Sequence, residues 1–110
     1  MAKNVLGEFE HQVLLASLRL ESEAYSASIV AELERVTGRE VSPAAVYIAL
    51  RRLEEGGLVT SEFRAGEAGE GGRERRYFRV HRRGLELMRE SRRRFMALWR
   101  GYENLIEDTR

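Results

Sequence analysis

Hydrophobic residues recur at intervals of three and four positions in the first half of the chain, which predicts three successive helices. The first, residues 6–20, carries apolar side chains on more than one face, so it must be covered on two sides. We expect one cover to be the protein's own core and the other to be a second subunit. The second helix is expected to be capped by Ser26 and to end at Gly38.

The third helix has the clearest start in the sequence. Ser42 offers a capping hydroxyl, and Pro43, the sole proline, fits the first helical position, where no backbone N–H is needed. The glycine pair at 56–57 is expected to end the helix in the left-handed conformation. Helical spacing predicts a buried side at Val46, Leu50 and Leu53.

From residue 58 onward the hydrophobic period changes to two. Apolar and polar residues alternate over residues 59–64 and again over 76–80, which predicts the two strands of a hairpin. The connection at 66–72 holds four glycines and two glutamates, so we expect a long polar tip. Arginines border this tip, as in the wing of a winged helix: Arg73, Arg75 and Arg76.

The C-terminal segment repeats hydrophobic positions at alternating intervals of three and four, which is the pattern of a helix that packs on another helix. The positions are Leu85, Met88, Arg92, Phe95, Trp99, Tyr102 and Ile106, and only the arginine interrupts the pattern. A single helix of about 25 residues would be ~37 Å long, which is more than so small a domain can cover. We therefore expect the same helix of a second subunit to cover it.

Three helices, a hairpin and a long terminal helix predict a mainly α fold of the α+β class, the winged helix-turn-helix. With 110 residues the chain is long enough for one such domain. We expect residues 1–81 to form the DNA-binding domain with its two-stranded β wing, and residues 82–110 to form a dimerisation helix.

The composition excludes several other classes of protein. The chain has no cysteine, so disulfides, thiolate metal sites and cysteine nucleophiles are excluded. Its two histidines, His11 and His81, have no matching carboxylate cluster, so no metal or cofactor is expected. Neither a signal peptide nor an apolar run of about 20 residues is visible, and we expect a cytoplasmic protein without membrane contact.

Charge is distributed unevenly, although the net charge is only +1. Residues 1–72 carry seven basic and twelve acidic side chains, whereas residues 73–94 carry ten arginines and three glutamates. Eighteen of the 19 basic residues are arginines, whose planar guanidinium suits phosphates and guanine edges. The codon preference of a GC-rich genome explains the arginine bias equally well, but it does not explain the clustering. The clustering favours a nucleic-acid partner.

Several short motifs occur along the chain in a fixed order. They are Leu-Gly-Glu-Phe-Glu at 6–10, Gly-Arg-Glu-Val-Ser at 38–42, Arg-Leu-Glu-Glu-Gly-Gly-Leu-Val at 52–59 and Gly-Gly-Arg at 71–73. In these motifs the sequence resembles the PadR-like family of bacterial transcriptional regulators, and in particular its short members with a single C-terminal helix. The resemblance extends over roughly residues 6–90 and implies a DNA-binding repressor.

The resemblance is weaker just after the second strand. There the family usually continues with threonine, proline and a small residue before a glycine, whereas this chain has His81, Arg82 and Arg83 before Gly84. The usual threonine cap of the terminal helix is therefore missing. The side chain of His81 can accept a hydrogen bond from the start of the helix in place of threonine, so we expect the helix to start within a few residues of this position.

The expected DNA contacts lie on the outer face of the third helix and at the wing: Ser42, Ala44, Ala45, Tyr47, Ile48, Arg51, Arg52, Arg73, Arg75 and Arg76. By the resemblance Tyr47 lies beside a phosphate, although it also fits the edge of a core. Ile48 either meets a thymine methyl or is a solitary exposed apolar residue. Arg51 and Arg52 either contact DNA or are solvated charges, and Arg52 alternatively pairs with Glu55 or another acidic neighbour.

The expected dimer contacts combine the first and last helices: Leu6, Phe9, Val13, Leu85, Met88, Phe95, Trp99, Tyr102 and Ile106. Phe95 and Trp99 lie one helical turn apart. In short drug-sensing members of the resembled family, an aromatic side chain near this position lines a flat chamber at the dimer centre. These two residues therefore either bind a small aromatic effector or fill the core of the dimer.

These observations predict a sequence-specific transcriptional regulator, acting as a repressor and as a two-fold dimer on a pseudo-palindromic operator. Two alternatives remain open. One is a ligand-sensing regulator of the multidrug or phenolic type, and the other is a protein-interaction module built on the winged-helix scaffold. An enzyme is not expected, because no glycine-rich phosphate loop precedes a helix and no nucleophile and base have recognisable spacing.

Overall fold

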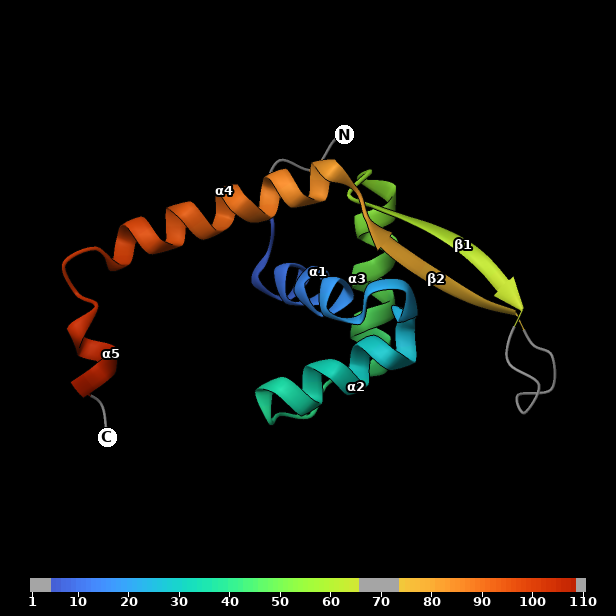
Figure 1. Ribbon diagram of the computed structural model, residues 1–110, viewed down its shortest axis with the longest axis horizontal. Helices are drawn as coiled ribbons and strands as arrows, with labels where there is room; N and C mark the ends of the chain where they lie inside the picture. Colours follow the sequence, from blue (N-terminus) through green and yellow to red (C-terminus); the bar gives the residue numbers. More distant parts are fainter. Residues whose placement is uncertain (1–4, 66–73, 109–110) are drawn as a thin grey trace.

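The computed structural model describes residues 5–65 and 74–108. A helical body carries a hairpin on one side, and a long helix crosses the body and extends beyond it on the other side (Figure 1). The expected mainly α, winged helix-turn-helix architecture is confirmed. In chain order the elements are α1 (Glu8–Leu20), the 3₁₀ turn η1 (Glu21–Glu23), α2 (Ser26–Thr37), α3 (Pro43–Glu55), β1 (Val59–Ala65), β2 (Glu74–Val80), α4 (Arg82–Trp99) and α5 (Asn104–Asp108).

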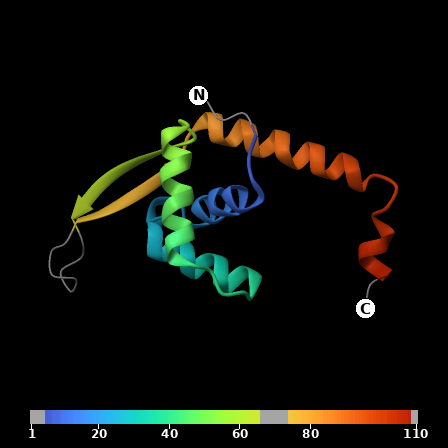
Figure 2. The ribbon, with the colours of Figure 1, turned by 180° about the vertical axis from the view of Figure 1, so that it is seen from behind.

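The body consists of α1, α2 and α3, each of which contacts the other two. Seen from either side, α3 crosses α1 and α2 at a steep angle (Figures 1 and 2). Burial of each large apolar side chain contributes about 1.5–3 kcal/mol, so the core formed here is the main source of stability. Its largest fully buried side chains are Val13, Leu14, Ile29, Val46, Leu50, Leu53, Leu58 and Val59.

The start of α2 differs from the prediction. Ser26 is the first helical residue rather than the cap, and Tyr25 is at the cap position. Instead, the hydroxyl of Ser28 accepts a hydrogen bond of 2.9 Å from the backbone N–H of Tyr25. Tyr25 is held in an extended conformation because its backbone also bridges to Tyr77 in β2. The end of α2 at Gly38, with φ of +71°, is as predicted.

The start of α3 is as predicted. Ser42 is the cap, its hydroxyl accepts from the backbone N–H of Ala45 at 3.2 Å, and Pro43 is the first helical residue. At the other end only Gly57 adopts the left-handed conformation, with φ of +78°, whereas Gly56 stays right-handed. The α3 helix is therefore anchored at a defined residue at each end.

The hairpin pairs β1 with β2 in antiparallel register from Val59 opposite Val80 to Ala65 opposite Glu74. Both strands reach closer to the tip than the alternation of the sequence predicts, because backbone pairing continues where side chains are no longer buried. The backbone N–H of Phe78 also donates to the Ala24 carbonyl at 2.8 Å. The predicted glycine-rich connection at 66–72 lies outside the described residues.

The terminal helix is shorter than predicted. Instead of one helix of about 25 residues, α4 ends at Trp99, and α5 begins at Asn104 after a bend (Figure 1). Gly101 has φ of +90°, which is incompatible with a helix, and its N–H donates to the carboxylate of Glu103 at 2.7 Å. The hydrophobic repeat therefore ends with α4, and Tyr102 and Ile106 do not continue it along one helix.

A very short joint connects the hairpin to α4. His81 alone separates β2 from α4, and its Nδ1 accepts from the backbone N–H of Arg83 at 3.0 Å, as the sequence predicts for a substitute cap. The backbone N–H of His81 donates to the Leu58 carbonyl at 2.9 Å. Gly84 is buried against this same carbonyl, which leaves no room for a Cβ atom. Within residues 5–65 and 74–108, no helix is long and apolar enough to cross a membrane.

Candidate nucleic-acid interface

The face of α3 that points away from the core is open. Tyr47 and Ile48 are half exposed, at 50% and 49%, whereas Val46 and Ala49 beside them are buried. Ser42 and Ala44 are exposed near the start of the helix, and Ala45 is partly exposed. The predicted contact residues of α3 therefore share one accessible surface, to which Arg51 and Arg52 add two exposed guanidinium groups. Two large apolar or aromatic side chains beside two cations suit a groove that offers both methyl groups and phosphates.

Tyr47 and Arg51 interact within this surface. Arg51 Nη1 donates to the Tyr47 hydroxyl at 3.2 Å, and its guanidinium carbon lies 5.9 Å from the ring centroid. The hydrogen bond to Tyr47 is the main cause that raises the pKa of Arg51, with a smaller contribution from Glu55. The Glu55 carboxylate is 3.9 Å from Arg51 Nη2, so its partner is Arg51 and not Arg52. Arg52 is exposed, with no polar partner among the described residues.

The wing arginines make contacts within the protein. The guanidinium of Arg75 lies 4.2 Å from the ring centroid of Tyr25. Arg76 Nη2 lies 3.3 Å from Glu54, and its guanidinium lies 5.2 Å from the ring centroid of Phe63. The third predicted contact of the wing, Arg73, lies outside the described residues.

A cluster of side chains that the sequence did not predict joins the hairpin to the body. The guanidinium of Arg64 lies 3.4 Å from the ring centroid of Tyr77 and donates to the backbone carbonyl of Ser22. Tyr77 in turn contacts Tyr25 edge to face, with ring centroids 5.3 Å apart. Each of these residues looks like an ordinary strand or loop residue in the sequence. Only the fold brings them together.

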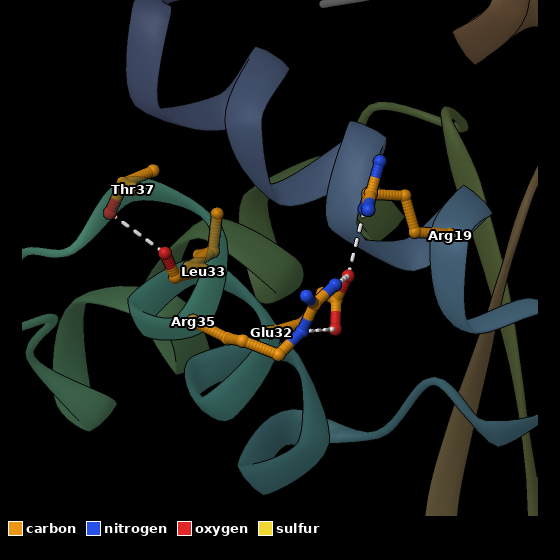
Figure 3. A network of polar contacts seen from close by, with 5 residues as sticks. All are labelled: Arg19, Glu32, Leu33, Arg35 and Thr37. Atoms are coloured by element: carbon orange, nitrogen blue, oxygen red, sulfur yellow. Dashed lines mark hydrogen bonds and ion pairs between the residues drawn. The ribbon is translucent and has the colours of Figure 1, made fainter.

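An ion-pair network joins α1 to α2 (Figure 3). Glu32 accepts from Arg35 at 2.6 Å and from Arg19 at 2.7 Å. These hydrogen bonds, first that of Arg35 and then that of Arg19, lower the pKa of Glu32 to about 2. The network is solvent-exposed on the arginine side, and it links the two helices that support α3.

The predicted dimer residues divide into two groups. Val13 has no exposed surface, and Leu6 and Met88 are only 7% and 6% exposed. These three side chains pack in the core of the protein itself, and Leu6 also lines the groove described below, so their contact with a partner stays a prediction. Phe95 and Tyr102, in contrast, are 62% and 61% exposed. Phe9, Leu85 and Trp99 are intermediate, and the side chain of Ile106 lies outside the described part of the chain.

An open groove of about 730 Å³ runs between α1 and α4. Its apolar lining includes Leu6 and Leu15 on one side and Phe95 and Met96 on the other, but not Trp99. Beyond the groove, Leu98 is 79% exposed, and every residue from 92 to 98 is exposed. The second half of α4 therefore has almost no cover from the described part of the chain, as we expected from the length of the predicted terminal helix.

His11 lies beside this groove. Its Nδ1 is 3.2 Å from the Ser91 hydroxyl of α4, and burial lowers its pKa. Nothing in the sequence pattern indicates a role for this histidine, but it forms a direct link between α1 and α4. No cluster of three potential metal ligands is present among the residues that the structure describes.

The family model described as "Transcriptional regulator PadR-like family" matches residues 14–90. A PadR family transcriptional regulator from Eggerthella lenta is 30% identical, over 90% of this chain and 87% of that chain, with a TM-score of 0.64. A PadR-like regulator from Bacillus cereus shares the fold at 21% identity, with 89% and 90% covered and a TM-score of 0.66. A putative transcriptional regulator from Thermoplasma acidophilum shares it at 16% identity, with 94% and 100% covered and a TM-score of 0.69. No curated protein matches the sequence.

Proposed function

Because the chain belongs to the PadR-like family of transcriptional regulators, we propose that it binds specific DNA sites as a two-fold dimer and represses the promoters it occupies. Like its relatives in this family, the chain is a regulator of transcription and not an enzyme. The observation that carries the proposal is the open face of α3. There Tyr47 and Ile48 are half exposed on a helix that is firmly capped by Ser42.

In this proposal α3 enters the major groove. Ile48 meets the methyl group of a thymine, and Arg51 reads a guanine edge. Tyr47 and Arg52, with Ser42, Ala44 and Ala45 at the start of the helix, contact or approach the phosphate backbone. In the free protein the hydrogen bond to the Tyr47 hydroxyl holds the Arg51 guanidinium at the surface. On binding, Arg51 replaces this hydrogen bond with one to the DNA. The wing, with Arg73 and Arg75, contacts the adjacent backbone or the minor groove.

The dimer is proposed from the uncovered half of α4. Phe95, Met96 and Leu98 are 50% exposed or more on one helix, and Leu15 of α1 adds an exposed side chain across the groove. An apolar surface of this kind, flanked by charged residues, is typical of an interface. The α4 helix of a second copy, packed against the groove, would cover it. Residues 82–110 would then act as the dimerisation segment and place two α3 helices one turn of DNA apart, about 34 Å.

A second candidate function is supported by the same groove. Its volume of about 730 Å³ and its lining by Leu15, Phe95 and Met96 suit a flat aromatic molecule. Such an effector would bind at the dimer centre and alter the separation of the two α3 helices, which would lower the affinity for DNA. In this scheme Phe95 contacts the effector directly. Trp99 would contact it from the other subunit of the proposed dimer.

The test is selection of bound fragments from genomic DNA, followed by titration of the best fragment at two salt concentrations. One inverted repeat with an affinity that falls steeply with salt is the expected result. If no fragment binds better than random DNA, the proposal is wrong. A protein-interaction module built on the same scaffold would then be the better explanation.

A further inference from the structure

Two arginines of the hairpin are held on opposite faces of the sheet. Arg64 lies opposite Arg75 in the register, and Arg76 lies opposite Phe63. Because side chains alternate between faces along a strand, the guanidinium groups of Arg64 and Arg76 emerge on different sides of the hairpin. Each is bound to a different part of the body, so the hairpin is restrained from both sides.

On the first side, Arg64 ties the outer part of β1 to the connection between α1 and α2. Its guanidinium stacks at 3.4 Å on the ring of Tyr77 and donates to the carbonyl of Ser22 in η1. Tyr77 is only 8% exposed, although it lies on a two-stranded sheet. The stack requires a planar guanidinium, because an ammonium group can still donate a hydrogen bond but cannot reproduce the stacking geometry.

On the second side, Arg76 ties β2 to α3. Arg76 Nη2 lies 3.3 Å from Glu54, which is in the last turn of α3, and Arg76 Nε donates to the Ser61 hydroxyl at 2.9 Å. That hydroxyl donates to Glu54 at 2.5 Å and so closes a triangle of contacts. The wing is thus connected to the same helix whose open face is the candidate reading surface.

We propose that Arg64 and Arg76 are positioning residues, which set the angle of the wing relative to α3 before DNA binds. This inference rests on the proposed DNA-binding function. Seven residues of strand extend ~23 Å, so a rotation of ~10° at the base would move the end of the hairpin by ~4 Å. Such a displacement exceeds the range of a hydrogen bond, so the wing's contacts with DNA depend on this angle. Arg76 acts through Glu54 and not by touching a phosphate.

Charge and position can be separated by two substitutions. Arg64→Lys preserves the positive charge but removes the stack, so it weakens DNA binding only if position matters. Glu54→Gln removes a negative charge beside DNA, so simple electrostatics predicts tighter binding, whereas loss of the restraint predicts weaker binding. The matched controls are Arg79→Lys, an exposed arginine on β2 with no polar partner among the described residues, and Glu40→Gln, an exposed glutamate just before α3.

The experiment measures the fluorescence anisotropy of a labelled duplex of mixed sequence, about 30 base pairs long, as protein is added at several salt concentrations. The temperature is kept below the thermal unfolding midpoint of every variant. We expect Arg64→Lys and Glu54→Gln to bind about tenfold more weakly than the wild type. Loss of one or two wing contacts should also reduce the salt slope by about 1 to 2. A lower stability alone would not change that slope. Both controls should bind at least half as tightly as the wild type.

Two outcomes would overturn the inference. One is binding of Arg64→Lys within twofold of the wild type, and the other is tighter binding of Glu54→Gln. If the wild-type protein itself fails to bind the duplex at low salt, the proposed function is wrong and the inference falls with it. If the wild type binds the duplex and both variants bind it equally tightly, only the positioning role of the two arginines is contradicted.

Discussion

At the scale of the residue, the proposed DNA contact of α3 depends on the pair formed by Tyr47 and Arg51. We predict that Tyr47→Phe weakens binding to all sequences by about fivefold, because one phosphate contact and the support of Arg51 are lost. Arg51→Ala should cost about 1–3 kcal/mol at the selected site and change the preferred base. Competition titrations with duplexes altered at single positions measure both effects. An equal loss on every sequence for Arg51→Ala would contradict its reading role.

A second prediction at this scale concerns pH. The folded-state pKa of Glu32, about 2, lies below its ordinary value of 4.5. Its network with Arg19 and Arg35 is therefore fully stabilising above pH 4.5 and is lost as the pH falls through 2. Glu32→Gln should lower the urea midpoint at pH 7, and the difference from wild type should narrow below pH 4.5. Glu86→Gln, on the exposed side of α4, serves as the control. A difference that stays constant down to pH 3 would contradict the assignment.

How far these residues could be predicted depends on the range of their contacts. Ser42 and Pro43 were assigned correctly because a helix cap is a local feature of the sequence. The stack of Arg64 on Tyr77 could not be predicted, since it joins positions that only the register of the hairpin and the packing of η1 bring together. Similarly, the cap of α2 was misplaced at Ser26 because a bridge to β2 fixes the preceding residue, Tyr25.

At the scale of the element, α4 depends on one close approach to the body. A Cβ atom on Gly84 would lie 2.5 Å from the Leu58 carbonyl oxygen and 3.1 Å from a methyl group of Val80. Since the nearest atom belongs to the backbone, α4 would have to shift. We predict that Gly84→Ala destabilises the protein by about 1–3 kcal/mol in urea unfolding, whereas Glu86→Ala on the same helix changes stability little. An unchanged midpoint for Gly84→Ala would show that the joint can relax.

The ends of elements were harder to predict than their existence. The hydrophobic repeat passed through residue 101 without interruption, and this suggested one continuous helix. The left-handed conformation of Gly101 ends that helix instead, and the repeat alone does not reveal it, because an isolated glycine is tolerated in many helices. Val13 was assigned to a helix expected to serve both the core and a dimer interface, and its full burial places it on the core side; apolar residues on more than one face of a helix do not indicate which face is turned inward.

At the scale of the whole molecule, assembly should depend on the exposed half of α4. We predict that Leu98→Glu, which places a charge at the most exposed large hydrophobic side chain among the described residues, converts the proposed dimer to a monomer in sedimentation equilibrium. DNA affinity should fall at least tenfold, because two linked half-sites become independent. Val36→Glu, at a 51% exposed position on α2, is the matched control for added charge and should remain dimeric. A dimeric Leu98→Glu protein would exclude this surface as the interface.

The one-residue joint at His81 has a consequence for the choice of operator. Because β2 continues almost directly into α4, and the Leu58 carbonyl holds the joint, each subunit of the proposed dimer has little freedom to swivel. One additional base pair between half-sites moves the second half-site by ~3.4 Å and turns it by ~34°. A dimer whose subunits cannot rotate at this joint cannot contact both displaced half-sites, so it must release one of them. The affinity of the regulator should therefore depend on the length of the spacer as strongly as on the base sequence. Duplexes whose spacer is one base pair longer should be bound with the affinity of a single half-site.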